Sequence, residues 1–389
     1  MNTPNSALKS DAKNNDSVDE IKKTFDLNRT QRSALGYILE AGELPRSRLA
    51  EYCGVSAPAI TRIARELIAR DLLVVSGKGG NTRGQPSTNL AVNPKGAFSL
   101  GVFIERDALS FALLNFVGDP VSSKRVTGLF DDPLPSMPAL LEELDGFIAA
   151  EGPNPERIVG LGVAITGNFV LDGHTVVPPK DMKKWMGLDF AELFRAHYSF
   201  PILIENDGSA ATLGEQLTGQ GQKYKTFFYI HMANGLGGGY VLDGKLVRGA
   251  HGNASELGHL VPAPTIRPTL RSLAENLDRP LGDISYKEIE SMFAGGDEKF
   301  FAWLNQAIAN IQPVVTSIAV LMDPQAIVLG GKFPPNVVNY IIEKLFIDAY
   351  GDHWADVARP AIVPAKNYSA DAAVYGAAAL PLHQLLLAE

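Results

Sequence analysis

An α/β body preceded by a small helical domain is the fold class that the sequence predicts, and three observations predict it. Residues 27–76 show helical periodicity in three short bursts. Residues 77–88 are rich in Gly and polar side chains, which is typical of a loop or linker. From Leu90 onward, apolar runs typical of buried strands alternate with helical segments, and this order indicates an α/β architecture.

The composition and the charge narrow the class of protein. The 389 residues are 46% hydrophobic and 20% charged, which excludes a mostly disordered, collagen-like or coiled-coil chain. The net charge of −8 is unevenly spread, because residues 1–98 carry +4 and the remainder carries −12. A basic end on an acidic body favours nucleic-acid binding by that end, although a solvated basic surface gives the same balance.

The cysteine content and the hydropathy bear on the compartment. The single cysteine, Cys53, excludes an intrachain disulfide framework and a Cys-rich zinc or iron–sulfur cluster. The first thirty residues contain no long apolar run typical of a signal peptide, and no stretch of about 18 uncharged apolar residues follows. We therefore expect a cytoplasmic protein with no membrane partner.

The chain is expected to begin with three short regions before the body. Residues 1–26 are polar and are predicted to form a mobile tail, residues 27–76 a helical domain, and residues 77–96 a wing and linker. In the body, strands are expected at 100–104, 109–116, 159–165, 201–204, 226–231 and 327–329, and helices at about 136–150, 188–198, 208–218, 299–322 and 336–349.

The helical domain has the layout of a helix-turn-helix. Its second helix opens at Pro45, and its third starts at Ala57 after the tight turn Cys-Gly-Val-Ser. Ser56 is expected to cap the third helix, with Pro58 in the first turn. A helix, a short glycine turn and a second helix form the helix-turn-helix unit. The apolar run 72–76 before a polar loop suggests a wing.

The third helix is the expected recognition helix. Its apolar side chains, which share one face, are Ile60, Ile63, Ala64 and Leu67. The opposite face holds small residues, which permit close approach to base edges, and Thr and Arg side chains, which can contact phosphates or bases. The residues of this domain that we predict to contact DNA are Arg46, Ser47, Ser56, Ala57, Thr61, Arg62 and Arg65. A small helical bundle with a solvated basic face is the alternative.

A polar pair follows one of the expected strands of the body. Asn206 and Asp207 come after the strand at 201–204, and the carboxyl ends of strands in open α/β sheets are common ligand positions. An Asn–Asp pair can exchange hydrogen bonds with adjacent hydroxyl groups, and Asp207 could act as a general base on one of them. The alternative is a helix N-cap, which both residue types favour.

Further ligand candidates lie downstream. A Gly-rich turn at 233–239 lets backbone N–H groups approach ligand oxygens, but it lacks the ending of a Walker loop. Glu256 and His259 are three residues apart and could reach one ligand, or one of them could be a metal ligand. A purely structural pair is the alternative. Gly330 and Gly331 end another strand, where the backbone can pass close to a ligand.

The order of these motifs resembles the ROK family of repressors, open reading frames and sugar kinases, in its regulator branch with an amino-terminal winged helix-turn-helix. The resemblance covers nearly all of residues 27–389. It rests on the runs SRLAEYCGVSAPAITRIARELIARDLL, RGQPSTNLAVNP, IENDGSAATLGE, LGGGYVLDGKLVRGAHGNASELGHL, AIVLGG and DAAVYGAAAL.

The resemblance implies a two-lobed, actin-like ATPase fold of the ribonuclease H-like type. Lobe 1 would comprise residues 97–206 plus 372–389, and lobe 2 residues 207–371. A sugar would bind in the cleft, and the matching ligand-binding residues are Gly167, Asn206, Asp207, Glu256 and His259. Kinase members use the residue matching Asp207 as a general base, whereas regulators use the same groups to sense a sugar.

The resemblance also concerns DNA and assembly. It implies that the linker RGQPS touches the minor groove, where Arg83 and Gln85 would suit a narrow A·T-rich segment. The alternative is a plain flexible wing. Family members are usually dimers or tetramers, so we expect a homodimer or homotetramer on a palindromic operator.

Two departures from the family bear on catalysis. The kinases carry an Asp-x-Gly-Gly-Thr phosphate loop, but here Phe103 replaces the acid, and Glu105 and Arg106 replace the glycines. The Gly-Thr-Gly phosphate turn of the family is Ala-Asn-Gly at 233–235. Phosphoryl transfer depends on positioning and on charge neutralisation, so we expect no kinase activity and no cofactor, although Asp207 is present.

Another departure concerns the zinc loop. Family members carry several cysteines after the Gly-His pair, whereas the segment 261–269 has none. Structural zinc needs four N or S ligands, so no bound metal is expected, and a metal-ligand role for His259 does not carry over.

Arg271 stands where family members have a glutamate that reaches the sugar. A guanidinium only donates hydrogen bonds and is cationic, so an acidic sugar, a sugar phosphate or an oxidised polyol would be favoured. Two alternatives remain: Glu275 could supply the lost carboxylate, or Arg271 could pair with Glu256 or Asp207.

Taken together, these features predict a sugar-responsive, DNA-binding transcriptional repressor whose kinase-like body binds a sugar or sugar derivative without phosphorylating it. An active ATP-dependent sugar kinase that carries a DNA-binding domain is the main alternative. A further alternative is a body that binds another protein and no small ligand.

Overall fold

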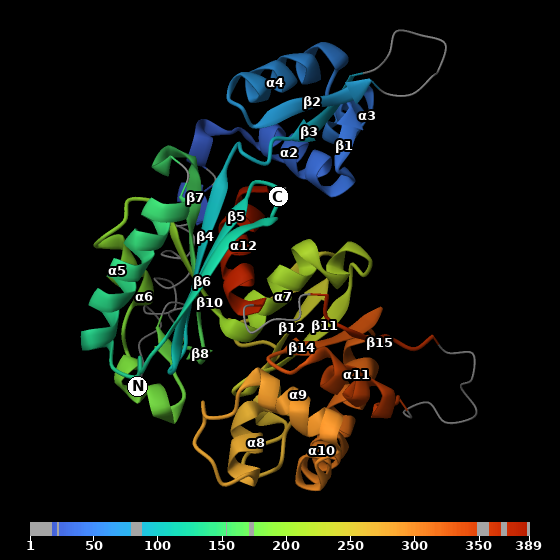
Figure 1. Ribbon diagram of the computed structural model, residues 1–389. Coiled ribbons are helices and arrows are strands. Elements are labelled where there is room, and N and C mark those ends of the chain that lie inside the picture. Colours follow the sequence, from blue (N-terminus) through green and yellow to red (C-terminus); the bar gives the residue numbers. More distant parts are fainter. Residues whose placement is uncertain are drawn as a thin grey trace, which may run out of the picture.

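The computed structural model describes residues 18–21, 23–78, 88–152, 154–170, 175–347, 358–366 and 372–386. These residues form an amino-terminal winged helix domain, called the head below, and a body of two lobes (Figure 1). A five-stranded sheet lies at the centre of each lobe.

The helices α2, α3 and α4 and a small sheet make up most of the head. Its sheet has the strand order β1-β3-β2. The capping box of Asn28 and Gln31 starts the first of these helices, and Gly54, in the left-handed conformation with φ 62°, ends the second. The elements are α2 (Arg29–Ala41), β1 (Glu43–Pro45), α3 (Arg46–Cys53), α4 (Ala57–Ala69), β2 (Leu73–Lys78) and β3 (Thr88–Val92).

The expected recognition helix is α4, and its inward face is as predicted. The side chains of Ile60, Ile63, Ala64 and Leu67 are all buried. Ser56 occupies the N-cap position, but its side chain makes no capping hydrogen bond, contrary to expectation.

The head begins earlier than the sequence suggests. Residues 18–21 are helical, and Ile21 is fully buried in the same apolar cluster as Ala34 and Leu35. Helical structure thus starts inside the segment that was expected to be a mobile tail, because an apolar side chain there can join the core of the head. Residues 1–17 lie outside the described residues.

Lobe 1 has a mixed sheet in the order β10-β7-β4-β5-β6. The helix expected at 188–198 is shorter than predicted. On one face the sheet packs with α5 and α6, and α12 (Ala372–Leu386) covers the other (Figure 1). The elements are β4 (Phe98–Ile104), β5 (Ala108–Asn115), β6 (Pro120–Thr127), α5 (Pro133–Glu151), β7 (Ile158–Ile165), β8 (Asn168–Phe169), β9 (Val176–Val177), α6 (Phe190–Arg195) and β10 (Ile202–Asn206).

Lobe 2 has the sheet order β13-β12-β11-β14-β15, in which β11, β14 and β15 are parallel. The helix expected at 336–349 ends at Lys344, because Leu345 is extended. The elements are α7 (Asp207–Thr218), β11 (Phe227–Met232), β12 (Leu236–Leu242), β13 (Lys245–Val247), α8 (Leu270–Asn276), α9 (Tyr286–Gly295), α10 (Glu298–Met322), β14 (Ala326–Gly331), α11 (Pro335–Lys344) and β15 (Ala361–Pro364).

The helix α10 is the one described helix that is long and apolar enough, by length and composition alone, to cross a membrane. It contributes Trp303, Leu304 and Ile311 to the buried core of lobe 2, in the same cluster as strand residues Phe228 and Ile327. A helix packed in this way is the core helix of a lobe.

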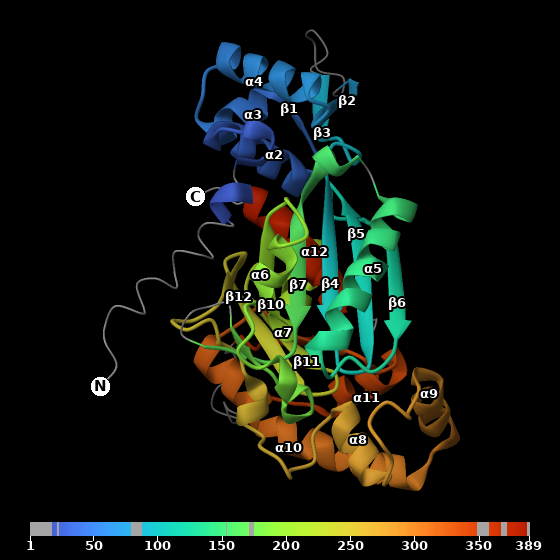
Figure 2. The ribbon, with the colours of Figure 1, turned by 90° about the vertical axis from the view of Figure 1, so that its left-hand side faces the viewer.

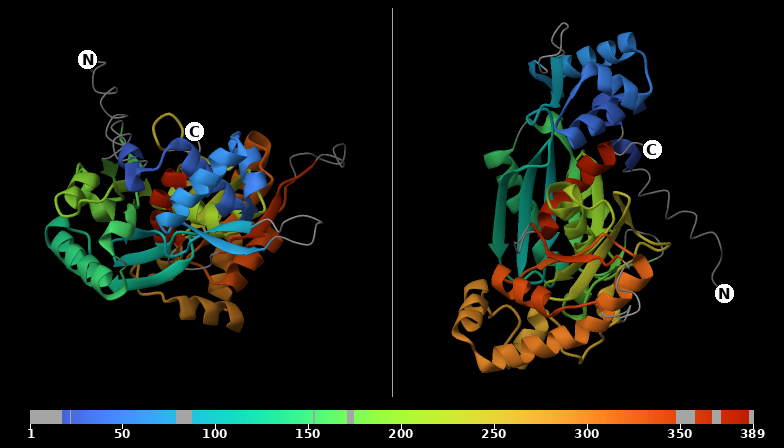
Figure 3. Two further views of the ribbon diagram at one scale, coloured as in Figure 1. Left: turned by 90° about the horizontal axis from the view of Figure 1, so that it is seen from above. Right: turned by 90° about the vertical axis from the view of Figure 1, so that its right-hand side faces the viewer.

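The helices α7 and α12 pack against each other between the lobes, and α12 extends to the head (Figures 1 and 2). Their contact is very close: a Cβ placed at Gly376 would lie 1.7 Å from the Ala210 carbonyl oxygen. At the far end, a Cβ placed at Gly36 of α2 would lie 3.0 Å from the Leu386 carbonyl oxygen of α12. The head therefore sits directly on the end of α12, as the right-hand view of Figure 3 also shows.

Candidate functional site

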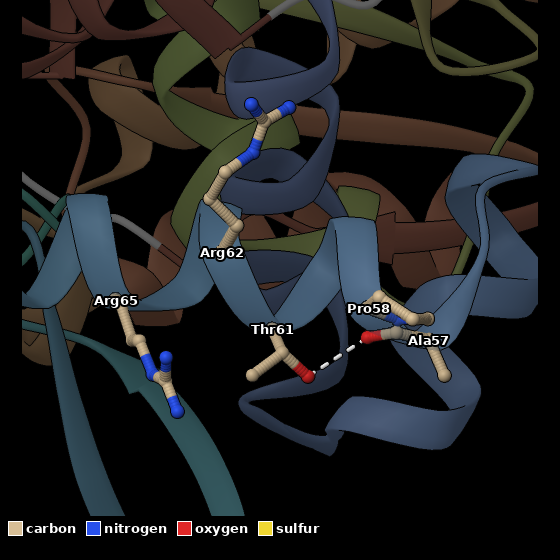
Figure 4. A pocket seen from close by; sticks show the side chains of 5 residues that line it. All are labelled: Ala57, Pro58, Thr61, Arg62 and Arg65. Carbon is tan, nitrogen blue, oxygen red and sulfur yellow. Dashed lines mark hydrogen bonds between the residues drawn. The ribbon is translucent and has the colours of Figure 1, made fainter.

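The outward face of α4 forms a shallow hollow at the tip of the head (Figure 4). The residues that line it are Ala57, Pro58, Thr61, Arg62 and Arg65. Ala57, Arg62 and Arg65 are exposed, and Thr61 is half-buried. The small residues at the helix start leave room for a close approach, and two guanidinium groups supply positive charge and directional donors.

The polar groups of this face are available for new contacts. The Thr61 hydroxyl donates to the Ala57 carbonyl oxygen at 2.8 Å, so its lone pairs remain to accept hydrogen bonds. Arg62 lies 4.0 Å from Glu66, an exposed ion pair of little energetic weight. Figure 4 shows Thr61 and Arg65 pointing to the same side of α4, while Arg62 points to another.

The other predicted DNA contacts either do not line this hollow or cannot be placed. Arg46 and Ser47 form the first turn of α3, with Ser47 exposed. Ser56 is exposed at the start of α4. Arg83 and Gln85 lie outside the described residues.

The second candidate site lies in the body, where β10 ends and α7 begins. The Asn206 side chain accepts hydrogen bonds from the backbone N–H of Gly208 at 2.8 Å and of Ser209 at 3.2 Å. Its amide nitrogen donates to the Gly167 carbonyl oxygen at 2.9 Å. Asn206 is therefore the N-cap of α7, which was the alternative that the sequence left open, and its amide is largely used for structure.

Gly167 is fixed by its backbone. Its φ of +143° is unfavourable for other residues, and a Cβ there would lie 2.6 Å from both Val176 Cγ1 and the Val177 carbonyl oxygen. Only glycine fits this close crossing, so Gly167 contributes a carbonyl group that orients Asn206.

Asp207 and Glu256 are two carboxyl groups whose pKa is raised by burial. Asp207 Oδ2 accepts from the Thr166 hydroxyl at 3.0 Å, and burial raises the pKa of Asp207 to about 6. Burial, reinforced by the charge of Asp207, raises the pKa of Glu256 to about 7. Near neutral pH these groups can therefore accept hydrogen bonds from hydroxyls, and a protonated carboxyl can also donate one.

His259 lies at the exposed end of a short 3₁₀ helix, Leu257–His259, that directly follows Glu256. Its backbone N–H donates to the Glu256 carbonyl oxygen at 3.2 Å. Glu256 is half-buried, whereas His259 is exposed, so the two side chains are in different environments.

Arg271 does not have the partners that the sequence suggested. Its guanidinium donates to Asp181 Oδ2 at 2.7 Å, and not to Glu256 or Asp207. Arg106 lies 3.9 Å from the same carboxylate. Asp181 belongs to lobe 1 and Arg271 to lobe 2, so this ion pair crosses from one lobe to the other. Glu275, the other suggested carboxylate, is exposed.

Three further polar contacts cross between the lobes, and sequence reasoning missed all of them. Asn253 exchanges two hydrogen bonds of 2.7 Å with the backbone of Phe169. Arg248 donates to Glu205 Oε2 through two nitrogens, at 3.0 and 2.7 Å. Lys332 pairs with Glu105. Only Lys332 had a local signal, since it follows the Gly-Gly pair at a strand end.

No group of three or more His, Cys, Asp or Glu residues that could hold a metal ion occurs among the residues that the structure describes. Cys53, on α3 in the head, is far in the chain from the cleft residues and has no second cysteine with which to pair.

Comparisons with known proteins identify both parts of the chain. Residues 99–384 match the ROK family, and residues 25–83 match the MarR family. The y4fQ protein of Sinorhizobium fredii is 27% identical over 82% of either chain. The xylose repressor of Bacillus subtilis is 24% identical over 62% of this chain and 63% of its own, and the DNA-binding transcriptional repressor Mlc of Escherichia coli is 23% identical over 62% of this chain and 59% of its own.

Solved structures show the same fold. A ROK family transcriptional regulator, described as a homologue of Escherichia coli Mlc, matches 92% of this chain and 98% of its own with a TM-score of 0.69 and 20% identity. A ROK family glucokinase from Streptomyces griseus matches 73% of this chain and 99% of its own, with a TM-score of 0.60 and 22% identity. The chain thus belongs to the ROK family and carries a MarR-type winged helix domain at its amino terminus.

Proposed function

We propose that this protein is a transcriptional repressor that binds operator DNA through α4 and releases it when a sugar or sugar derivative binds in the body. The observation that carries the proposal is the outward face of α4, where the exposed side chains of Arg62 and Arg65 and the hydroxyl of Thr61 line one hollow in the winged helix domain. The similarity of the chain to the xylose repressor and to the repressor Mlc supports the same role.

The effector site is proposed to centre on Asp207 and Glu256. Both carboxyl groups are desolvated, and an incoming sugar hydroxyl would supply the hydrogen bonds that water no longer does. Asn206 and Gly167 position the start of α7 rather than bind the ligand through free polar groups. His259 would contact only the outer side of a ligand, because it is exposed.

We further propose that the body does not phosphorylate its ligand. Phosphoryl transfer needs backbone donors and cations free to contact phosphate oxygens. Here Glu105 places a carboxylate in the first phosphate loop and binds two cations itself. The alternative, an active sugar kinase, predicts ATP consumption in a coupled assay over a panel of sugars, whereas a repressor body predicts none above the no-sugar background.

The path from the effector site to the head is short. The helix α7 begins at Asp207, and its far end packs beside the segment where α12 meets α2. A groove between head and body is lined by Gly36 and Glu40 of α2, Gln216 of α7 and His383 of α12. A ligand that prefers one position of α7 would therefore shift the head relative to its operator.

DNA binding and its control by a sugar can be tested together. Genomic fragments selected by the purified protein should yield a protected sequence, and one sugar of a panel should weaken that complex. Arg62→Ala and Arg65→Ala should lose the complex, while Lys299→Ala, an exposed charge on α10, should keep it. Protein that selects no sequence, or that no sugar displaces, would refute the proposal.

The proposal includes a palindromic operator that is bound by a homodimer or homotetramer. It also includes a cytoplasmic location. Footprinting would show two half-sites about one or two helical turns apart. Light scattering gives the oligomer size. Arg83 and Gln85 are proposed to enter the minor groove. In that case Arg83→Ala relaxes the preference for A·T pairs, whereas an equal loss on every sequence indicates a phosphate contact.

Arg271 is proposed to favour an acidic effector. An anionic group of the effector would displace Asp181 from the Arg271 guanidinium and accept two hydrogen bonds from it. Calorimetry with a hexose and its uronic acid tests this role. Tighter binding of the neutral sugar, or equal binding to the Arg271→Ala variant, would exclude it.

A further inference from the structure

A buried carboxylate, Glu105, holds two cations between the lobes. Its side chain is only 3% exposed and lies where the β4–β5 hairpin turns. Arg125 of β6 donates to one carboxylate oxygen at 2.8 Å and also to the Ser110 hydroxyl at 2.9 Å. Lys332 of lobe 2 pairs with the other oxygen. One carboxylate thus faces one positive charge from each lobe.

The direction of Lys332 is set by the backbone. Gly331 has φ +125°, and a Cβ there would lie 2.1 Å from the Met232 carbonyl oxygen, so only glycine permits this path. The Lys332 N–H donates to the same carbonyl at 2.8 Å. The ammonium is therefore directed toward Glu105, with 8% of its side chain exposed.

Within the cluster, the Glu105 carboxylate offsets one of the two positive charges. Burial opposes the ionisation of Glu105, but Lys332 and Arg125 outweigh it and hold the pKa of Glu105 below its usual value. Next to them, burial and the charge of Lys332 lower the pKa of His231 to about 4, so this imidazole is neutral. Neither of its ring nitrogens has a hydrogen-bond partner in the described part of the chain, although His231 is only 4% exposed.

We propose that Glu105 is a built-in anion: it fills a phosphate-binding subsite formed by Lys332 and Arg125, excludes external phosphates from it, and holds the two lobes together without a nucleotide. Two convergent cations and a neutral, unpartnered imidazole are groups suited to bind a phosphate group, yet a carboxylate of the chain already contacts both cations. This inference deepens the proposal that the body does not phosphorylate its ligand.

Neutralising Glu105 should therefore open the subsite. The Glu105→Gln variant keeps the shape of the side chain but leaves Lys332 and Arg125 without their anion. Inorganic tripolyphosphate should then bind the variant at least about tenfold more tightly than the wild type. One hydrogen bond to a charged group contributes enough binding free energy for that difference. Calorimetry and the shift of the unfolding temperature measure this difference.

Two further variants make the comparison specific. Glu205→Gln also removes a buried carboxylate that joins the lobes, through Arg248, and should gain no tripolyphosphate binding. In the double variant Glu105→Gln with Lys332→Gln, the gain should disappear. If Glu105→Gln folds only when tripolyphosphate is present, that rescue supports the proposal equally.

The proposal is overturned if wild type and Glu105→Gln bind tripolyphosphate equally, if Glu205→Gln gains as much, or if tripolyphosphate neither binds nor rescues the variant. Its failure can be separated from failure of the proposed function. Sugar-dependent release of operator DNA by the wild-type protein tests the repressor alone, and ATP consumption by the wild type tests the kinase alternative alone.

Discussion

Asp207 illustrates how burial of an acidic side chain shifts its pKa at a cost to the fold. Its carboxyl group is buried with a hydroxyl and one backbone N–H as hydrogen-bond donors, and burial keeps its pKa near 6. The uncharged form is therefore favoured by folding, whereas the unfolded chain ionises near the ordinary value of 3.8. Such a cost at a buried acid is typical of a functional position rather than of a purely structural one.

The pH dependence of stability tests this environment. Because the folded-state pKa of Asp207 is raised, its penalty is absent at low pH and grows as the pH rises from about 4 to about 6, after which it is constant. The difference in unfolding free energy between Asp207→Asn and the wild type should therefore increase by about 1.5 kcal/mol, in favour of the variant, from pH 5 to pH 8. Urea unfolding at both values measures this gain, and Glu290→Gln, at an exposed acid, should show none.

The two arginines of α4 make a second prediction at this scale. If both contact phosphates, changing Arg62 and Arg65 to Ala should reduce the slope of log affinity against log salt by about 0.9 for each lost contact. Lys299→Ala should leave the slope unchanged, because it lies at the start of α10, in the body. An unaltered slope in the double variant would mean that another face meets the DNA.

Among the elements, α7, which begins at Asp207, packs on α12, and α12 packs on α2 of the head. The contact of the two helices depends on small residues: a Cβ at Gly214 would lie 3.2 Å from Gly376 Cα, and one at Gly376 would collide with the Ala210 carbonyl. The two backbones consequently approach so closely that neither helix can shift without displacing the other.

A substitution at this contact should report on the link. Gly376→Ala should destabilise the protein by about 1–3 kcal/mol through overpacking, and should also reduce the factor by which sugar weakens DNA binding. Gly146→Ala on α5 is the matched control, since a Cβ there meets nothing within 4 Å and should stabilise its helix by about 0.5–1 kcal/mol. If sugar weakened DNA binding by the same factor in the two variants, the contact of α7 with α12 would not transmit the effect of the sugar to the head.

For the molecule as a whole, several polar contacts join the two lobes. They are the pairs Asn253–Phe169, Arg248–Glu205, Arg271–Asp181 and Lys332–Glu105. All join segments that are far apart in the chain, so they form only when both lobes are folded. The two lobes are thus joined by several separate polar contacts rather than by a single one.

Asn253 tests the contribution of these contacts to ligand binding. Asn253→Ala removes both hydrogen bonds with Phe169 and should weaken sugar binding by up to about thirtyfold, since each of the two bonds is worth about 1 kcal/mol. DNA affinity without sugar should stay the same, because Asn253 lies outside the head. Calorimetry and a DNA-binding titration separate the two effects. Unchanged sugar affinity would show that the hydrogen bonds between Asn253 and Phe169 do not contribute to sugar binding.

The sequence by itself determined the features that depend on neighbouring residues. The turn at Gly54 and the inward face of α4 follow from local backbone preferences and helical periodicity, so they were predictable. The start of α7 at the end of β10 and the loss of phosphate-loop glycines at Glu105 are likewise visible in short runs. The burial of Ile21 was missed, because a single apolar residue in a polar segment gives no periodic pattern.

Only the tertiary structure decided how the distant residues are paired. Glu105 and Lys332 are 227 residues apart, and Arg271 and Asp181 are 90 apart, so no local pattern links them. Their meeting depends on the register of two sheets and on the packing of α7 and α12 between the lobes. The physical reason is that hydrogen bonding within a helix or turn is fixed by chain connectivity, whereas a buried charge takes whichever partner the folded lobes bring within reach.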